Sequence, residues 1–338
     1  MPELVSIVGS GQMGLVMADA LAERGSEVRL WCRRPEFARE LSDSRRSPLL
    51  PGFELSPKVE VISDDHAALD GATVILCAVP TQFIRSVFTR LRWDVKKDAI
   101  VVSVSKGIEV ETLLSPTQII AQMLGDVTTY PSHPMCALSG PAIARELAER
   151  LPATLVAASI DEMIAERVQD LFSVPWLRIY RKSDLLGVEI AGATKNVIAI
   201  AAGIVDGLGI GLNAKSALLA RGLSEIARLG TAMGAKLDTF FGIAGVGDLA
   251  TTCFSPHGRN RSCGERLGKG ESIDAILSST DYVVEGVSTT KSMMTLASVH
   301  GVEMPITAAV HAILFKGLSP EKAINELMQR EPKPERIG

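Results

Sequence analysis

Short, continuously apolar runs alternate with segments of helical periodicity along the first half of the chain. The apolar runs predict strands at Leu4–Val8, Val28–Cys32, Val59–Ile62, Thr73–Val79, Ala99–Ser103, Cys136–Ser139 and Ala153–Ala158. The segments between most of them predict helices at Met13–Arg24, Pro35–Leu41, Thr81–Leu91, Ser115–Leu124, Ala142–Glu149 and Asp161–Phe172. Strands that are apolar throughout are typical of a sheet covered on both faces. The alternation therefore predicts an α/β fold with a doubly wound parallel sheet and right-handed crossovers.

After about Arg181 the strand-like runs nearly disappear and helical periodicity dominates. The predicted helices are Leu185–Val205, Ala214–Met233, Ile273–Leu277, Ser288–His300, Ile306–Phe315 and Pro320–Gln329. We therefore predict two domains, an α/β domain over residues 1–182 and an all-α domain over residues 183–338. The tail 331–338, rich in proline and charge, is expected to fray.

Composition excludes several classes of protein. Hydrophobic residues make up 46% of the 338 residues and charged residues 22%, as in an ordinary globular chain. The net charge of -4 gives no electrostatic reason to expect nucleic acid or an anionic membrane as a partner. The five cysteines form no C-x-x-C pair, which favours a reducing compartment. The charges within Leu185–Val205 favour a buried helix over a membrane span, and no signal peptide is visible, so we expect a cytoplasmic protein.

A glycine-rich loop follows the first predicted strand and opens the first helix. It reads Gly9-Ser10-Gly11-Gln12-Met13-Gly14. In this spacing the first glycine allows a tight turn, the second lets the backbone approach a pyrophosphate, and the third lets helix and strand pack closely. The helix N-terminus then presents N–H groups to the phosphates. The pattern predicts a Rossmann-type dinucleotide site; the alternative is a glycine-rich turn without a ligand.

The end of the second predicted strand bears on which dinucleotide binds. A site that prefers NAD usually has an acidic residue there for the ribose 2′-hydroxyl, but none occurs before Glu36. Arg33 and Arg34 stand there instead, and guanidinium groups suit a 2′-phosphate. We therefore predict NADPH as the favoured cofactor, with NADH possible; the alternative is a solvated basic turn.

Two lysines are candidates for chemistry. Lys106 follows a strand end, where ligands of open α/β sheets bind, although an ordinary loop lysine fits equally well. Lys195 lies in a segment that is apolar on nearly every face, so its burial is costly unless it is paired or functional. Burial also lowers the pKa of a lysine, which suits proton transfer. A pair with Glu189 is disfavoured because six residues do not place both on one helix face.

Weaker motifs follow. Leu138–Pro141 makes a second strand-to-helix turn. Gly242–Leu249 is a glycine-rich turn that presents Asp248, and Gly258–Arg261 offers a cation and an amide. Taken alone, the last two motifs are better explained as surface loops. No histidine has metal-ligand spacing and no G-x-S-x-G occurs. We predict neither a metal site nor an acyl-transfer triad.

Taken together, these segments resemble the bacterial-type NAD(P)-dependent glycerol-3-phosphate dehydrogenases over almost the whole chain. The motifs that carry the resemblance are Gly9–Gly14, Leu49–Gly52, Ser105–Ile108, Leu138–Pro141, Ala193–Gly203, Ala220–Ile226, Gly245–Leu249, Arg259-Asn260, Val284–Val287 and Met304–Ile306. The resemblance implies reduction of dihydroxyacetone phosphate to glycerol 3-phosphate for phospholipid synthesis. It implies that Lys195 is the general acid/base, that Lys106 contacts substrate and cofactor, and that Asp248 orients Lys195.

The resemblance also implies the remaining site residues. The cofactor would be bound by Gly9, Gly11, Gln12, Met13, Gly14, Arg33, Arg34, Lys106, Ala144, Arg259, Val283 and Glu285. The substrate would be bound by Lys106, Gly140, Ala142, Lys195, Asn196, Asp248, Gly258, Arg259 and Asn260, with the last two on its phosphate.

The chain departs from the family pattern at several of these positions. Gly258 and Ala142 stand where the family usually has hydroxyl residues, and Ile143 and Met13 stand where it usually has aromatic ones. Two hydroxyl contacts to substrate are therefore missing. Alternatives are a related reductase of another small hydroxy acid, such as ketopantoate, and a cofactor-binding redox sensor without catalysis. The oligomeric state is left open, a homodimer included.

Overall fold

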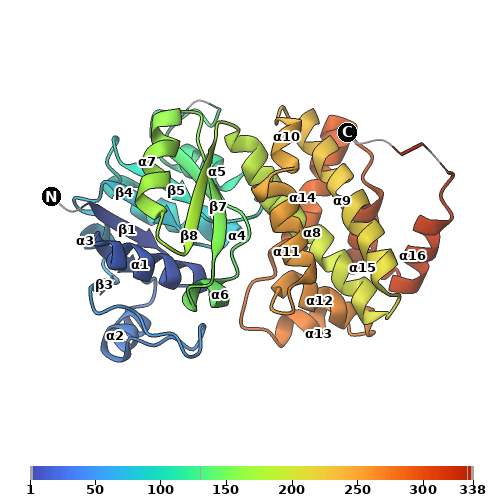
Figure 1. Cartoon of the computed structure of the whole chain (residues 1–338), viewed down its shortest axis with the longest axis horizontal. Helices are drawn as coiled ribbons and strands as arrows, with labels where there is room; N and C mark the ends of the chain where they lie inside the picture. The colour runs from blue at the N-terminus through green and yellow to red at the C-terminus, as the bar shows by residue number, and fades with distance from the viewer. Residues whose placement is uncertain (1–2, 130, 333, 336–338) are drawn as a thin grey trace. The chain divides into compact units, whose positions relative to one another are not determined.

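Eight strands form one sheet in the N-terminal part of the computed structural model, which describes residues 3–129, 131–332 and 334–335 (Figure 1). The strands are β1 (Leu4–Val8), β2 (Glu27–Trp31), β3 (Val59–Ile62), β4 (Val74–Cys77), β5 (Ile100–Ser103), β6 (Met135–Ser139), β7 (Ala153–Ala158) and β8 (Leu177–Lys182). Their order is β3-β2-β1-β4-β5-β6-β7-β8. The first six follow the order of a doubly wound dinucleotide-binding sheet, which confirms the predicted fold class. The strand order reverses between β1 and β4, where Val8 aligns with Cys77.

Helices cover both faces of this sheet. They are α1 (Gln12–Arg24), α2 (Pro35–Ser44), α3 (Asp65–Leu69), α4 (Thr81–Leu91), η1 (Arg92–Asp94), α5 (Pro116–Met123), α6 (Ala144–Ala148) and α7 (Glu162–Phe172). Helices α1, α6 and α7 lie on one face, and α4 and α5 pack together on the other. Between them, β1, β4, β5 and β6 are almost wholly buried, as the continuous apolar runs predicted.

Two features of the sheet differ from the sequence prediction. Strand β8 was not predicted, because its buried Leu177 and Ile179 alternate with exposed Arg178 and Tyr180 instead of forming an apolar run. Strand β7 runs antiparallel to β6, which makes the sheet mixed rather than wholly parallel. The five-residue helix α6 rises only about 7.5 Å. This helix is too short to return the chain to the end of the sheet where β6 begins. Strand β7 therefore starts beside the carboxyl end of β6 and runs antiparallel to it.

The chain divides into two units. Unit 1 comprises Met1–Ser105 and Pro116–Leu185, and unit 2 comprises Lys106–Ser115 and Leu186–Gly338. The segment after β5 thus belongs to the helical unit, although it is inserted in the α/β sequence. Of the tail 331–338, for which fraying is expected, residues 333 and 336–338 lie outside the described residues.

Unit 2 is helical. Its elements are α8 (Leu185–Gly207), α9 (Leu212–Ala232), α10 (Leu237–Phe240), the π-turn η2 (Ile243–Gly247), α11 (Asp248–Phe254), α12 (Arg259–Gly268), α13 (Ile273–Ser278), α14 (Glu285–His300), α15 (Pro305–Lys316) and α16 (Pro320–Met328). Helix α8 is long and apolar enough to cross a membrane, but its most apolar window is 100% buried, so it is the core helix of this unit.

The region between α10 and α12 is more helical than predicted. The stretch 242–249 is not a turn, because η2 runs directly into α11 and places Asp248 in its first turn. The stretch 258–261 is not a surface loop but the start of α12. Six glycines lie between positions 242 and 268, and they interrupt the apolar spacing on which the helix prediction depended.

Candidate functional site

The glycine-rich loop of unit 1 has the conformation that its spacing predicted. Gly9 has φ +114°, and a Cβ on it would lie 2.8 Å from the Ala78 carbonyl oxygen. A Cβ on Gly14 would lie 1.9 Å from the Gly9 carbonyl oxygen, whereas one on Gly11 would meet nothing within 4 Å. Gly11 is the N-cap of α1 and supplies no side-chain cap. The first N–H groups of α1 are thus available to an anion, so the loop fits the pyrophosphate of a dinucleotide.

The side chains around this loop have identifiable contacts within unit 1. Gln12 Nε2 donates to the Leu49 carbonyl oxygen at 2.5 Å, and Met13 is partly buried against the core. Arg33 and Arg34 follow β2 and are exposed, and the Arg34 guanidinium lies 5.6 Å from the Phe37 ring centroid. Two exposed cations therefore lie directly after the carboxyl end of β2.

The turn after β6 is also in unit 1. Gly140 has φ +138°, a conformation that favours glycine. Ala142 and Ala144 are partly buried and pack against the core of this unit, and Ala144 begins α6. Neither alanine offers a side-chain hydrogen bond, so any contact they make with a ligand is through backbone or methyl groups.

A buried carboxylate joins two lysines in unit 2. Asp248 Oδ1 accepts from Lys195 Nζ at 2.5 Å, and Asp248 Oδ2 accepts from Lys106 Nζ at 2.8 Å. Asp248 is 1% exposed and Lys195 is 7% exposed. With both lysines protonated the cluster carries a net charge of about +1, which suits an anionic ligand.

The environment of Lys195 changes its proton affinity. Burial lowers the pKa of Lys195 from 10.5 to about 8; Asp248 opposes this shift and the nearby Lys106 adds to it. The disfavoured pair with Glu189 does not form, since the Glu189 carboxylate accepts from Ser115 Oγ at 2.6 Å instead. Lys195 can thus exchange a proton near neutral pH, as a general acid or base must.

Thr252 belongs to this cluster and was not identified from the sequence. Its Oγ1 lies 2.5 Å from Lys195 Nζ. It follows Asp248 by four residues on α11, so both side chains lie on one face of the helix. That spacing was the available signal, but it has meaning only once the segment is known to be a helix.

Two asparagines connect the segments around the lysines. Asn196 Nδ2 donates to the Lys106 carbonyl oxygen at 3.0 Å, and Asn260 Nδ2 donates to Asn196 Oδ1 at 3.0 Å. The backbone N–H of Gly286 donates to Asn260 Oδ1 at 2.9 Å. These bonds occupy both amide oxygens and one N–H of each amide, so each asparagine can offer a ligand one remaining N–H donor.

The start of α12 presents a cation next to this chain of amides. Arg259 is exposed, its Nη1 donates to the Val283 carbonyl oxygen at 3.4 Å, and its guanidinium lies 6.0 Å from the Tyr282 ring centroid. Gly258 is the N-cap and gives no side-chain cap. Glu285 begins α14 directly after the segment that Arg259 contacts. The helix N-terminus and Arg259 together form an anion-binding geometry.

Comparisons with known proteins give matches along most of the chain. Residues 4–165 match the model described as NAD-dependent glycerol-3-phosphate dehydrogenase N-terminus, and residues 184–325 match the corresponding C-terminus. The chain is 47% identical to glycerol-3-phosphate dehydrogenase [NAD(P)+] 2 of Salinibacter ruber, over 98% of this chain and 96% of that one. It is 44% identical to the enzyme of Citrifermentans bemidjiense over 100% of both chains.

The chain belongs to the NAD-dependent glycerol-3-phosphate dehydrogenase family. The fold matches the crystal structure of glycerol-3-phosphate dehydrogenase from Coxiella burnetii with a TM-score of 0.92, at 34% identity, over 97% of this chain and 99% of that one. The resemblance inferred from the motifs is confirmed, and with it the class of NAD(P)-dependent oxidoreductases acting on a CH–OH group. Members of this family act on a small-molecule substrate.

Proposed function

We propose that this chain catalyses the NAD(P)-dependent interconversion of dihydroxyacetone phosphate and glycerol 3-phosphate in the cytoplasm, and so supplies glycerol 3-phosphate for phospholipid synthesis. The observation that carries the proposal is the Asp248 carboxylate held between Lys195 and Lys106 in a buried site. This cluster supplies a titratable donor, a fixed partner for it and a second cation for the oxygen of a bound ketone.

Each residue has a role that follows from its contacts. When bound, the nicotinamide ring supplies the hydride. Lys195 gives its proton to the carbonyl oxygen during reduction, while Asp248 and Thr252 hold its Nζ in place. Lys106 provides a second positive charge beside the same oxygen, because Asp248 holds it at 2.8 Å. In oxidation the same atoms act in reverse, with neutral Lys195 as the base.

The substrate phosphate is assigned to the start of α12. Arg259 provides a guanidinium, Asn260 one N–H, and the uncapped first turn its backbone N–H groups. The test of the whole proposal is oxidation of NADPH followed at 340 nm with dihydroxyacetone phosphate, with ketopantoate as the competing substrate. Turnover of ketopantoate alone favours the related reductases, and cofactor binding with no turnover favours a sensor.

NADPH is proposed as the preferred cofactor. Replacing both Arg33 and Arg34 with alanine is expected to raise the KM for NADPH by about 10- to 100-fold, because charge-assisted hydrogen bonds to the 2′-phosphate are lost. The KM for NADH should not change. Arg39→Ala removes an exposed arginine from α2, the helix that follows them, and is the matched control. Equal changes for both cofactors would contradict the proposal.

A hydroxyl at position 258 is expected to strengthen phosphate binding. Gly258 has φ -73°, which serine adopts without strain, and an added Cβ would lie 3.2 Å from the Thr252 carbonyl oxygen, a tight fit. Gly258→Ser should lower the KM for dihydroxyacetone phosphate by about 10-fold, the equivalent of one hydrogen bond to a charged group. Gly258→Ala controls for the added Cβ. If both variants lower the KM equally, the hydroxyl has no role.

A homodimer also remains a prediction, and light scattering of the purified chain tests it.

A further inference from the structure

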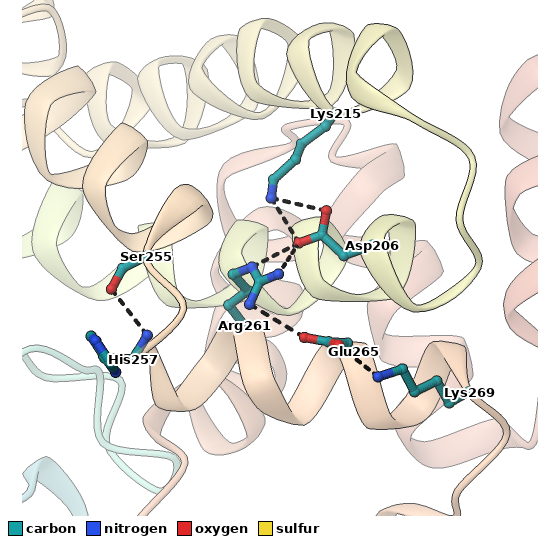
Figure 2. Close-up of polar contacts among 7 residues, drawn as sticks. All are labelled: Asp206, Lys215, Ser255, His257, Arg261, Glu265 and Lys269. Atoms are coloured by element: carbon teal, nitrogen blue, oxygen red, sulfur yellow. Dashed lines mark hydrogen bonds and ion pairs between the residues drawn. The ribbon is translucent and has the colours of Figure 1, made fainter.

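One carboxylate near the end of α8 binds cations from two other helices. Asp206 accepts from Lys215 Nζ at 2.9 Å through Oδ1 and at 2.7 Å through Oδ2. Arg261 Nε donates to Asp206 Oδ2 at 2.7 Å, and its Nη2 lies at the same distance from that oxygen. Figure 2 shows the carboxylate between the two cations, with Arg261 also reaching Glu265 on its own helix. The cluster thus joins α8, α9 and α12.

This cluster is too buried to be an ordinary surface ion pair. Lys215 is 5% exposed, and its Nζ lies 4.8 Å from the ring centroid of Phe254, the last residue of α11. The Arg261 side chain is 16% exposed. Removing such charges from water costs about as much as their attraction returns, so a buried pair is weak evidence for a role in stability. Such a cluster contributes less to stability than to holding α8, α9 and α12 in one arrangement.

Glycines bring α8 and α12 into backbone contact beside the cluster. A Cβ on Gly203 of α8 would lie 1.9 Å from the Arg261 carbonyl oxygen, and a Cβ on Gly264 of α12 would lie 1.9 Å from the Ile200 carbonyl oxygen. Gly207 and Gly268, four residues further along each helix, are also crowded by the opposite backbone. These contacts hold α12 against α8 from Arg261 onward, and Asn260 is bonded to Asn196 and Gly286. Arg259 is therefore the residue of the first turn that most needs further positioning.

The first turn of α12 carries the residues assigned to the substrate phosphate. Its N-cap is Gly258, without a side-chain cap, and the hydrogen bond of Arg259 to Val283 is long at 3.4 Å. Arg261, two residues on, has the short two-nitrogen contact to Asp206. We infer that Asp206 is a positioning residue which, through Arg261, holds the first turn of α12 so that Arg259 and Asn260 face the substrate phosphate. This inference rests on the proposed function.

The test separates phosphate positioning from general damage. Arg261→Gln removes the contact but leaves Asp206 paired with Lys215, so no buried carboxylate is left without a cation. Arg266→Gln is the matched control, because Arg266 also lies on α12 and pairs with a carboxylate, that of Glu271. For each variant, kcat/KM is measured with dihydroxyacetone phosphate and with dihydroxyacetone, which lacks the phosphate, at saturating NADPH.

Arg261→Gln is expected to lower kcat/KM for dihydroxyacetone phosphate by about 10- to 100-fold, since small misplacements of binding groups have effects of this size. The value for dihydroxyacetone should not change, and Arg266→Gln should change neither. Arg261→Lys restores a cation without the planar fork and should give a smaller loss. Equal losses for both substrates, or no loss for either, would overturn the inference. A wild-type chain that does not reduce dihydroxyacetone phosphate would contradict the proposed function itself, and the inference with it.

Discussion

Replacement of Lys195 with methionine is expected to lower kcat for dihydroxyacetone phosphate reduction by about 100-fold or more. Methionine keeps most of the volume of the side chain in the apolar helix α8 but cannot transfer a proton. Binding of NADPH should be unchanged, because the residues assigned to the dinucleotide phosphates belong to the loop of unit 1 and to the end of β2. Steady-state kinetics and a fluorescence titration with NADPH measure the two effects. An unchanged kcat would refute the role of Lys195.

The pH dependence tests the same role independently. The pKa of Lys195 is lowered to about 8, chiefly by burial. Reduction needs the protonated amine, so kcat should fall as pH rises above about 8; oxidation needs the neutral amine, so kcat should fall below about 8. Lys195→Arg is the control, because arginine can still pair with Asp248 but does not lose its proton in this range. A pH limb that persists in Lys195→Arg would assign the titration to another group.

The sequence alone predicted that Lys195 is buried and either paired or functional, but it did not predict which residue pairs with it. A lysine in an apolar helix must be buried, so burial and a partner could be inferred from α8 alone. The partner, Asp248, lies 53 residues away, and only the family resemblance connected the two. Thr252 went unidentified because the spacing of four residues means nothing in a predicted turn. The local sequence pattern thus identified the buried lysine, whereas its partners depend on tertiary contacts that the pattern does not contain.

In the fold, too, some elements were predictable from the local sequence and others depend on tertiary contacts. Strands buried on both faces, such as β1 and β4, were predicted because a short, continuous apolar run between turn residues is typical of a strand in a covered sheet. The edge strand β8 is covered on one face only, so its apolar residues alternate with polar ones. The direction of β7 depends on the length of α6. Continuous apolar runs indicate neither feature. The π-turn η2 and helix α12 contain glycines, such as Gly245 and Gly264, where their backbones pack closely against neighbours. Propensity assigns such a glycine-containing segment to a turn.

Glu225 is a further residue whose importance the sequence did not reveal, and its removal is expected to destabilise unit 2. Glu225 lies on α9, is 2% exposed, and accepts from the backbone N–H groups of Ile306 at 2.6 Å and Thr307 at 3.2 Å. These groups open α15, whose N-cap Met304 has no side-chain cap. Glu225 therefore caps a helix that lies 81 residues away in sequence. Glu225→Ala leaves these donors buried and unpaired, which should cost about 3 kcal/mol of unfolding free energy.

The cost should depend on pH in a definite direction. Burial raises the pKa of Glu225 from 4.5 to about 7, and the hydrogen bonds from Ile306 and Thr307 reduce this shift. Between these two values the native state binds a proton that the unfolded state has released. The contribution of Glu225 to stability is therefore greatest below pH 4.5 and falls by about 3 kcal/mol as pH rises to 7.

Urea unfolding at pH 5.5 and pH 8 measures this effect when the wild type is compared with Glu225→Gln. The glutamine variant is neutral at both pH values, so its unfolding free energy should change less with pH than that of the wild type. Glu326→Ala, an exposed glutamate on α16, is the control and should lie within about 0.5 kcal/mol of the wild type at each pH. If the wild type and Glu225→Gln change in parallel, the Glu225 carboxyl is ionised in both states. The hydrogen bonds that it accepts from the Ile306 N–H and from the Thr307 N–H and hydroxyl then outweigh its burial.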